Sequence, residues 1–177
     1  TGTYLFPVGK SSGNYFPFSL NVTAASSPVV TVEAFDSDAG AGATFDATLT
    51  GISHTEYWKA DLNSGTLTAN VSVSRITATG DKDVIGQSAA QGGDYTIING
   101  TASGSSINNS DAVTSLGYFV MATSFKKCPV STAVAPSADQ VVCQNVATNP
   151  LTATVTLSAG TGNPTIQYQW YYNTTNS

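Results

Sequence analysis

The chain has 177 residues, of which 41% are hydrophobic and only 10% are charged, and its formal net charge is −5. This apolar content suffices for a packed core and excludes gross disorder. Six Lys and Arg residues scattered along the chain cannot replace the counterions of a nucleic acid, so that class of partner is excluded. No apolar run approaches the roughly 20 residues needed to span a bilayer.

Alternating apolar and polar residues predict short β-strands in the first part of the chain. The clearest strand lies at 66–75, where a period of two directs one set of side chains toward a core. In chain order, the predicted strands are 4–8, 19–23, 29–35, 55–60, 66–75, 84–88, 95–99 and 116–123. Clusters of Gly, Ser, Asn and Asp predict turns between them, at 11–14, 36–42, 63–65, 80–83, 92–94 and 100–110.

The fold class follows from this pattern. No stretch carries apolar residues at helical spacing between helix caps. About eight short strands with regular turn signals indicate an all-β fold, specifically an antiparallel β-sandwich. The predicted core residues are Phe6, Phe18, Val30, Trp58, Leu67, Val71, Val73, Ile97, Phe119, Leu151, Val155 and Trp170.

The chain is expected to continue into a second domain. Residues 128–137 contain two prolines and small side chains, which predict a linker. We therefore assign 1–127 to a β-sandwich domain and 138–177 to the N-terminal part of a second, immunoglobulin-like β-sandwich. The strands predicted there are 140–143, 151–157 and 166–172. Trp170 resembles the buried tryptophan of immunoglobulin-like domains, and few residues follow it, so this domain is expected to be incomplete in the chain.

The two cysteines, Cys128 and Cys143, lie on either side of the expected domain junction. Two pairings are open: a disulfide between Cys128 and Cys143, or one between Cys143 and a residue beyond Ser177. Neither cysteine has His or Cys neighbours at zinc-ligand spacing. We therefore expect an exported, oxidising location.

Two patterns associated with catalysis are better explained as loops. Residues 9–13 match the G-x-S-x-G nucleophile elbow, which needs a preceding strand and a following helix. The next residues, 14–17, cannot start a helix, so a hairpin loop is favoured over a nucleophile at Ser11. His54, the only histidine, lies near Glu56 as a general base would require, but no nucleophile stands at a recognisable spacing. The chain is predicted not to be an enzyme.

An acidic segment at 36–40 is similar to the start of a calcium loop. Asp36 and Asp38 stand at alternate positions, as hard oxygen ligands for Ca²⁺ do, and Asp46 is a third candidate ligand from across the loop. The glycine comes too early for an EF-hand loop and no Glu closes it. A solvated turn is therefore favoured over a calcium site, and no other cofactor is predicted.

Three tyrosines are candidate contacts for a glycan: Tyr15, Tyr57 and Tyr118. Tyr57 and Trp58 are adjacent, so in a strand they point to opposite faces. One of the two is expected in the core. For the other, packing in a second layer is favoured over an exposed platform for a sugar ring.

Two sets of short motifs characterise the chain. The first set is FPVG at 6–9, Phe-Pro at 16–17, Tyr-Trp at 57–58, GDYT at 93–96 and LGYFV at 116–120; the second is PSADQVVCQN at 136–145 and YQWYYNTTNS at 168–177. They resemble the β-domains and immunoglobulin-like repeats of large secreted cell-surface adhesins of the Bacteroidota, which include the gliding adhesins. The resemblance implies export by the type IX secretion system, an extracellular, cell-surface location and a non-catalytic role.

The function implied by this resemblance is that of a structural or adhesive segment, a tandem β-sandwich spacer in a large multi-domain protein. The expected partners are the flanking domains of the same protein, the type IX secretion and gliding machinery, and a surface polysaccharide. Two alternatives stay open: a carbohydrate-binding module, and a filament-forming surface subunit joined through exposed edge strands.

Overall fold

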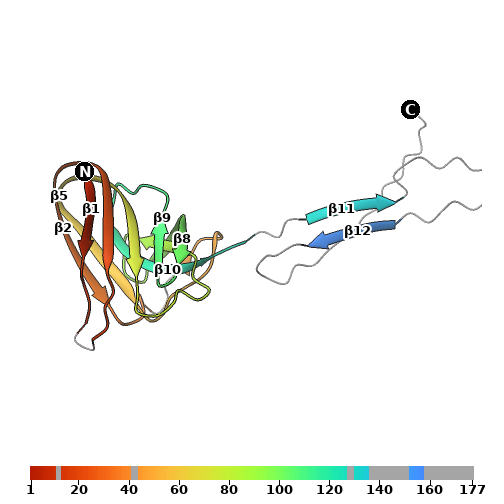
Figure 1. Ribbon diagram of the computed structural model, residues 1–177, viewed down its shortest axis with the longest axis horizontal. Coiled ribbons are helices and arrows are strands. Elements are labelled where there is room, and N and C mark those ends of the chain that lie inside the picture. Colours follow the sequence, from red (N-terminus) through yellow and green to blue (C-terminus); the bar gives the residue numbers. More distant parts are fainter. Residues whose placement is uncertain (11–12, 41–43, 127–129, 136–151, 158–177) are drawn as a thin grey trace, which may run out of the picture. The chain divides into compact units, whose positions relative to one another are not determined.

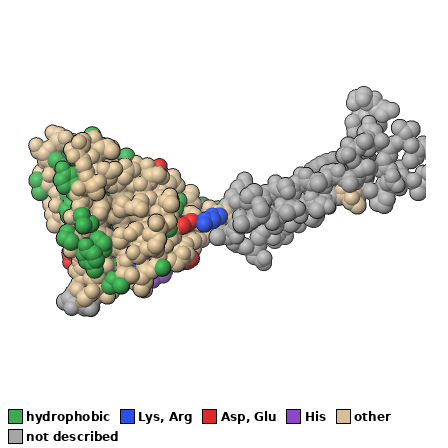
Figure 2. All heavy atoms as spheres, viewed as in Figure 1, with side chains coloured by type: hydrophobic (Ala, Val, Ile, Leu, Met, Phe, Trp, Pro, Cys, Tyr) green, Lys and Arg blue, Asp and Glu red, His purple; other side chains and the backbone are tan. Residues whose placement is uncertain are grey.

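The computed structural model describes residues 1–10, 13–40, 44–126, 130–135 and 152–157. Every regular element in these ranges is a β-strand, which confirms the all-β prediction (Figure 1). The chain divides into two compact units, Thr1–Phe125 and Lys126–Ser177. In the first unit, the visible surface carries few charged side chains, as the composition requires (Figure 2).

The first unit contains one continuous, ten-stranded sheet. Its strands are β1 (Gly2–Phe6), β2 (Phe18–Phe35), β3 (Thr44–Phe45), β4 (Leu49–Ile52), β5 (Tyr57–Ser74), β6 (Val84–Ser88), β7 (Asp94–Ile98), β8 (Gly100–Ser103), β9 (Ser106–Asn109) and β10 (Gly117–Ser124). The main path is β1-β2-β5-β10-β6-β7-β3, while β4 pairs with β10, and β9 pairs with β5 and β8. All pairings are antiparallel except the one between β3 and β7.

Strands β2 and β5 form a long ribbon that turns a corner at its middle. The sequence predicted two strands and a break in each of these regions, whereas the structure has one strand of 18 residues in each. The breaks correspond instead to register shifts between the two strands, which lie in β2 between Val22 and Ala24 and between Ser26 and Val30. Ser27 and Gly65 both have positive φ, at 43° and 79°. The predicted turn at 63–65 therefore bends the ribbon and does not end a strand, and no turn was predicted at Ser27.

Gly65 is required at this corner by space as well as by backbone conformation. A Cβ atom at this position would lie 2.3 Å from the carbonyl oxygen of Ser27 and 2.4 Å from that of Ser26. Both contacts are with backbone, which cannot rotate away as a side chain can. The two strands therefore approach each other at the bend more closely than any other residue type would permit.

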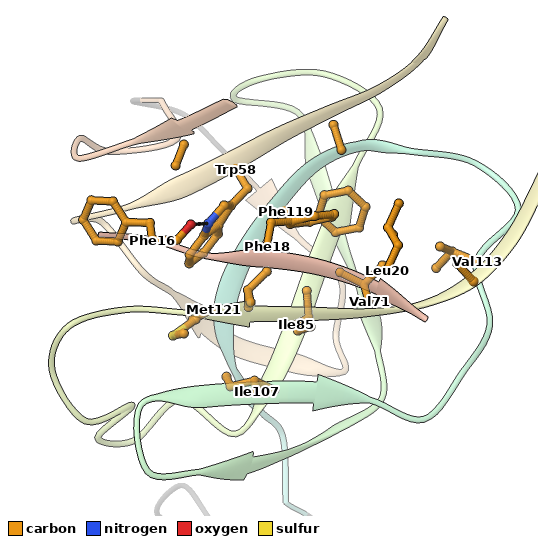
Figure 3. Close-up of a cluster of buried hydrophobic side chains, with 14 of the residues drawn as sticks. Phe16, Phe18, Leu20, Trp58, Val71, Ile85, Ile107, Val113, Phe119 and Met121 are labelled. Atoms are coloured by element: carbon orange, nitrogen blue, oxygen red, sulfur yellow. Dashed lines mark hydrogen bonds between the residues drawn. The ribbon is translucent and has the colours of Figure 1, made fainter. Parts of the chain in front are cut away.

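The sheet folds back on itself and encloses the main core, whose buried side chains are shown in Figure 3. Phe18, at the start of β2, packs against Phe119 in β10 with the ring centroids 5.3 Å apart. Trp58, near the start of β5, and Val71, near its end, are both fully buried in the same cluster. Residues from both halves of the long ribbon thus face one another across a single apolar interior, and their burial drives the bend.

A second, smaller core lies on the other face of β10. Phe119 and Met121 belong to the main core, whereas Val120 and Ala122 pack in the second cluster with Tyr95. All four consecutive β10 residues are therefore buried, which is typical of a strand covered on both faces.

The predicted strands at 84–88, 95–99 and 116–123 correspond to β6, β7 and β10. The predicted turn at 100–110 is wrong, because β8 and β9 form a hairpin there. Of the predicted core residues, the fully or almost fully buried ones are Phe18, Trp58, Leu67, Val71, Val73 and Phe119, and the partly buried ones are Phe6, Val30 and Ile97.

In the second unit, β11 (Val130–Ala135) pairs antiparallel with β12 (Thr152–Leu157). The predicted strand at 151–157 is thus confirmed for residues 152–157, while the predicted linker at 128–137 contains β11. The other predictions for this part lie outside the described residues: the strands at 140–143 and 166–172, the residues Leu151 and Trp170, and the pairing of Cys128 and Cys143.

Candidate functional site

The four ends of the two long strands meet at one polar pocket, here called the closure pocket. An 18-residue strand would span roughly 60 Å if it were straight. Yet Glu56 and Arg75, which flank β5 on either side, form an ion pair of 3.2 Å. The pocket has a volume of about 530 Å³ and is lined by Asn14, Phe16, Asp36, Ser37, His54, Thr55, Glu56, Arg75, Ile76 and Thr77.

The ion pair between Glu56 and Arg75 is largely buried, with side-chain exposures of 4% and 15%, and both side chains make further hydrogen bonds. The Glu56 residue is only 3% exposed. Its Oε1 accepts from Ser53 Oγ at 2.8 Å and from Arg75 Nη1 at 3.2 Å, and its Oε2 accepts from Thr55 Oγ1 at 2.5 Å. Arg75 also donates from Nε and Nη2 to the carbonyl oxygen of Ala78. Both charges are therefore compensated inside the fold, and the pair fastens the two ends of β5 together.

Two further contacts fasten β2 in the same way. The indole Nε1 of Trp58 donates to the carbonyl oxygen of Phe16 at 2.8 Å in a buried hydrogen bond, and the two rings meet edge to face. Phe16 lies just before β2, while Trp58 pairs with Ala34 near its end. Lys10 adds an ion pair of 3.2 Å to Glu33 near the same end of β2.

His54 lies at the rim of the closure pocket, exposed, just before β5. Its Nδ1 lies 3.0 Å from the Oδ2 atom of Asp38. Desolvation acts to raise the pKa of Asp38, but the hydrogen bonds from His54 and from the backbone N–H of Gly40 outweigh it and lower the pKa below its usual value. The Asp38 carboxylate thus pairs with His54, which lies in the loop before β5.

Within the described residues, the structure does not bring Asp36, Asp38 and Asp46 together as one group of metal ligands. Asp38 binds His54, and the Oδ1 atom of Asp46 accepts the backbone N–H of Thr48 at 2.8 Å. No group of three or more His, Cys, Asp or Glu side chains in the described ranges is arranged to hold a metal ion. The contacts of Asp38 and Asp46 are those of turns, the interpretation that the sequence favoured.

The three candidate glycan contacts lie in different environments. Tyr57 is 4% exposed and stacks on Phe35 at 4.4 Å, so it is not an exposed platform. Tyr57 and Trp58 point to opposite faces as predicted, but each face is a core. Tyr118 is half-buried, with its ring centroid 6.2 Å from that of Tyr57. Tyr15 is 47% exposed and is the one ring of the three that remains open to solvent.

The G-x-S-x-G segment joins β1 to β2. Ser11 lies outside the described residues, but its flanks form an antiparallel bridge between Gly9 and Tyr15. The backbone N–H of Lys10 also donates to the carbonyl oxygen of Asn14. These pairings are those of a hairpin, and no helix follows, so the context of a nucleophile elbow is missing here.

Glu56 and Arg75 were not selected as a pair by the sequence analysis. They are separated by a long strand that the analysis divided at 63–65. The available signal was a residue of opposite charge just outside each end of the segment, although Lys59 and Asp61 also carry charge within it. Only the bend at Gly65 shows that the two are neighbours.

No protein-family model, curated protein or solved structure matches this chain. Within the described ranges there is also no helix long and apolar enough to cross a membrane.

Proposed function

We propose that this chain is a non-catalytic structural segment of a large multi-domain bacterial cell-surface protein, in which successive β-units act as spacers in an adhesin. The observation that carries the proposal is the arrangement of two compact β-structured units in succession along the chain. A spacer needs a unit that resists opening. The fastened ends of β2 and β5 meet this need through the Glu56–Arg75 pair and the Trp58–Phe16 hydrogen bond.

The finer fold assignments belong to the same proposal. The sheet of the first unit, folded back around the main core, would serve as a β-sandwich. The antiparallel pair of β11 and β12 would be the beginning of an immunoglobulin-like sandwich. An experimental structure of the second unit, in the full chain or in a longer protein that contains it, tests this. A second unit of another topology would remove the immunoglobulin-like part of the proposal.

The cell-surface role is tested by labelling. An antibody raised against the chain should label intact, unpermeabilised cells, and labelling should be lost when the type IX secretion system is inactivated. Labelling that requires permeabilised cells would contradict the proposal.

A filament-forming subunit is the second candidate, and one feature of the surface favours it. In the described ranges, the outer edge of β1 has no strand partner, and Tyr4 and Leu5 on it are more than half exposed. An apolar pocket of about 440 Å³ lies beside this edge and is lined by Thr1, Tyr4, Phe6, Leu20, Val22, Ala25, Pro28, Val30 and Leu67. Unprotected edges of this kind add strands from other chains.

Sedimentation velocity separates the two candidates. The spacer proposal expects a monomer over the accessible concentration range. Concentration-dependent polymers that disappear in the Leu5→Lys variant, which places a charge on the β1 edge, would favour the filament instead.

A further inference from the structure

The closure pocket has the chemistry of a ligand site, and its charges restrict the ligand. Its guanidinium, on Arg75, is already engaged by Glu56 and by a backbone carbonyl. A phosphate or carboxylate ligand would therefore find no unpaired cation among the described lining residues. A multivalent metal ion lacks a three-ligand group in the same ranges. An uncharged ligand bound by hydrogen bonds and apolar contact needs neither an unpaired cation nor a metal-ligand group.

The lining side chains supply both kinds of contact. Asn14 and Thr77 place an amide and a hydroxyl at the pocket, and His54 adds a ring nitrogen beyond the one that contacts Asp38. Ile76 is 57% exposed and places an aliphatic side chain at the edge of the pocket. A ligand with a hydroxylated rim and an apolar face matches this combination. A pyranose sugar has both.

The size of the pocket is consistent with such a ligand. Its volume of about 530 Å³ lies within the range of about 300 to 1,000 Å³ that is typical of small-molecule sites. The segments that form it come from before and after β2 and from before and after β5. The Glu56–Arg75 pair holds the last two of these segments together without a ligand, so the pocket is formed in advance.

We propose that the closure pocket binds one residue of a neutral glycan. Asn14 and Thr77 hydrogen-bond its hydroxyl groups, and Ile76 covers one apolar face of its ring. This site differs from all three tyrosines that the sequence suggested, because none of them lines the pocket. It does not depend on the spacer role, since a spacer with or without the site would fold in the same way.

His54 makes the proposal directly measurable. It is the only histidine in the chain and it lines the pocket. Its imidazole signals in a ¹⁵N-edited NMR spectrum can therefore be followed without assigning the rest of the protein. The full chain would first be screened on an array of immobilised neutral and acidic polysaccharides. Oligosaccharides from the strongest neutral hit would then be titrated against the chain by NMR and calorimetry.

The expected result is a shift of the His54 signals on titration. Affinity should fall about tenfold in Thr77→Val, which removes one hydroxyl, and should also fall in Ile76→Ser. Thr101→Val is the matched control, because Thr101 is exposed on β8 away from the pocket, and it should bind normally. Tyr15→Ala should also bind normally.

Three results would overturn the proposal. The first is no binding to any neutral polysaccharide on the array. The second is binding that leaves the His54 signals unmoved. The third is binding that is lost in Tyr15→Ala and kept in Thr77→Val, which would place the glycan on the exposed tyrosine.

Discussion

Removing the guanidinium of Arg75 should open the fastening of β5 and destabilise the first unit strongly. In Arg75→Met, the carboxylate of Glu56, a residue that is 3% exposed, loses the one cationic partner that it has among the described residues. Breaking a buried pair from one side costs about 3 to 5 kcal/mol, because an uncompensated charge remains inside. We expect the lower end, about 3 kcal/mol, since the hydroxyls of Ser53 and Thr55 still donate to Glu56.

The measurement is urea unfolding followed by tryptophan fluorescence. The chain has two tryptophans, so the experiment is made in a Trp170→Phe background, where Trp58 alone reports on the main core. The double variant Glu56→Gln, Arg75→Met completes a double-mutant cycle. Because the double variant leaves no buried charge, it should be less destabilised than the sum of the two single variants.

The control is another ion pair of the same unit. Lys59→Met breaks the contact of 3.0 Å between Lys59 and Asp61, whose side chains are 37% and 46% exposed. An exposed pair is worth about 0 to 1 kcal/mol, so this variant should change the free energy of unfolding little. If Arg75→Met were no more destabilising than Lys59→Met, the fastening argument would be refuted.

Three other perturbations test separate parts of the first unit. Gly65→Ala, which forces a Cβ to 2.3 Å from a backbone oxygen at φ +79°, should cost more than about 2 kcal/mol by urea unfolding, whereas Gly51→Ala, with no atom within 4 Å, should be nearly neutral. Because folding lowers the pKa of Asp38, its contact with His54 stabilises the fold at pH values above the unfolded pKa of 3.8, and this stabilisation is lost as the pH falls through the folded pKa. His54→Gln should therefore be less stable than the unchanged chain at about pH 5 and equally stable in stronger acid. A stability difference that persisted in stronger acid would contradict the assignment. Burial, followed by the charge of Tyr57, raises the pKa of Tyr95 to about 12, and the Tyr95 hydroxyl is buried with no hydrogen-bond partner in the described ranges. Tyr95→Phe should therefore raise the midpoint temperature of thermal unfolding. A lower midpoint would show that the hydroxyl has a partner.

The sequence predicted the fold class because a period of two is a local signal. The alternation in 66–75 and the turn residues at 63–65 were both interpreted from neighbours along the chain. The hairpin of β8 and β9 was missed for the same reason, since its strands are short and rich in Ser, Asn and Gly. Such residues are depleted in strands, and they form strands here because β9 pairs with β5 and β8 pairs with β9.

The closure pocket could not be predicted in this way, because it is formed by residues that are far apart in the sequence and become neighbours only in the folded chain. Asn14, His54 and Thr77 come from three separate segments, and no spacing rule connects them. The relevant information is the direction of the bend at Ser27 and Gly65. A glycine between two alternating segments is equally compatible with a chain reversal that ends the strand, which was the interpretation made, and with a corner inside a continuous ribbon.

The corner at Gly65 and the ion pair of Arg75 both depend on the curvature of β5, so the destabilisations caused by substituting the two residues should not add. The ion pair forms only if β5 curves enough for its flanking residues to meet. Gly65→Ala strains the corner and so already weakens the contact between Glu56 and Arg75. Removing the guanidinium from that variant should therefore lower the free energy of unfolding by less than it does in the unchanged chain. In a cycle of Gly65→Ala and Arg75→Met, the double variant should be less destabilised than the sum of the single variants, by more than the ~0.5 kcal/mol scatter of independent sites. Simple addition of the two effects would mean that β5 holds its curvature without the fastening, and that the ion pair follows from the bend without contributing to it.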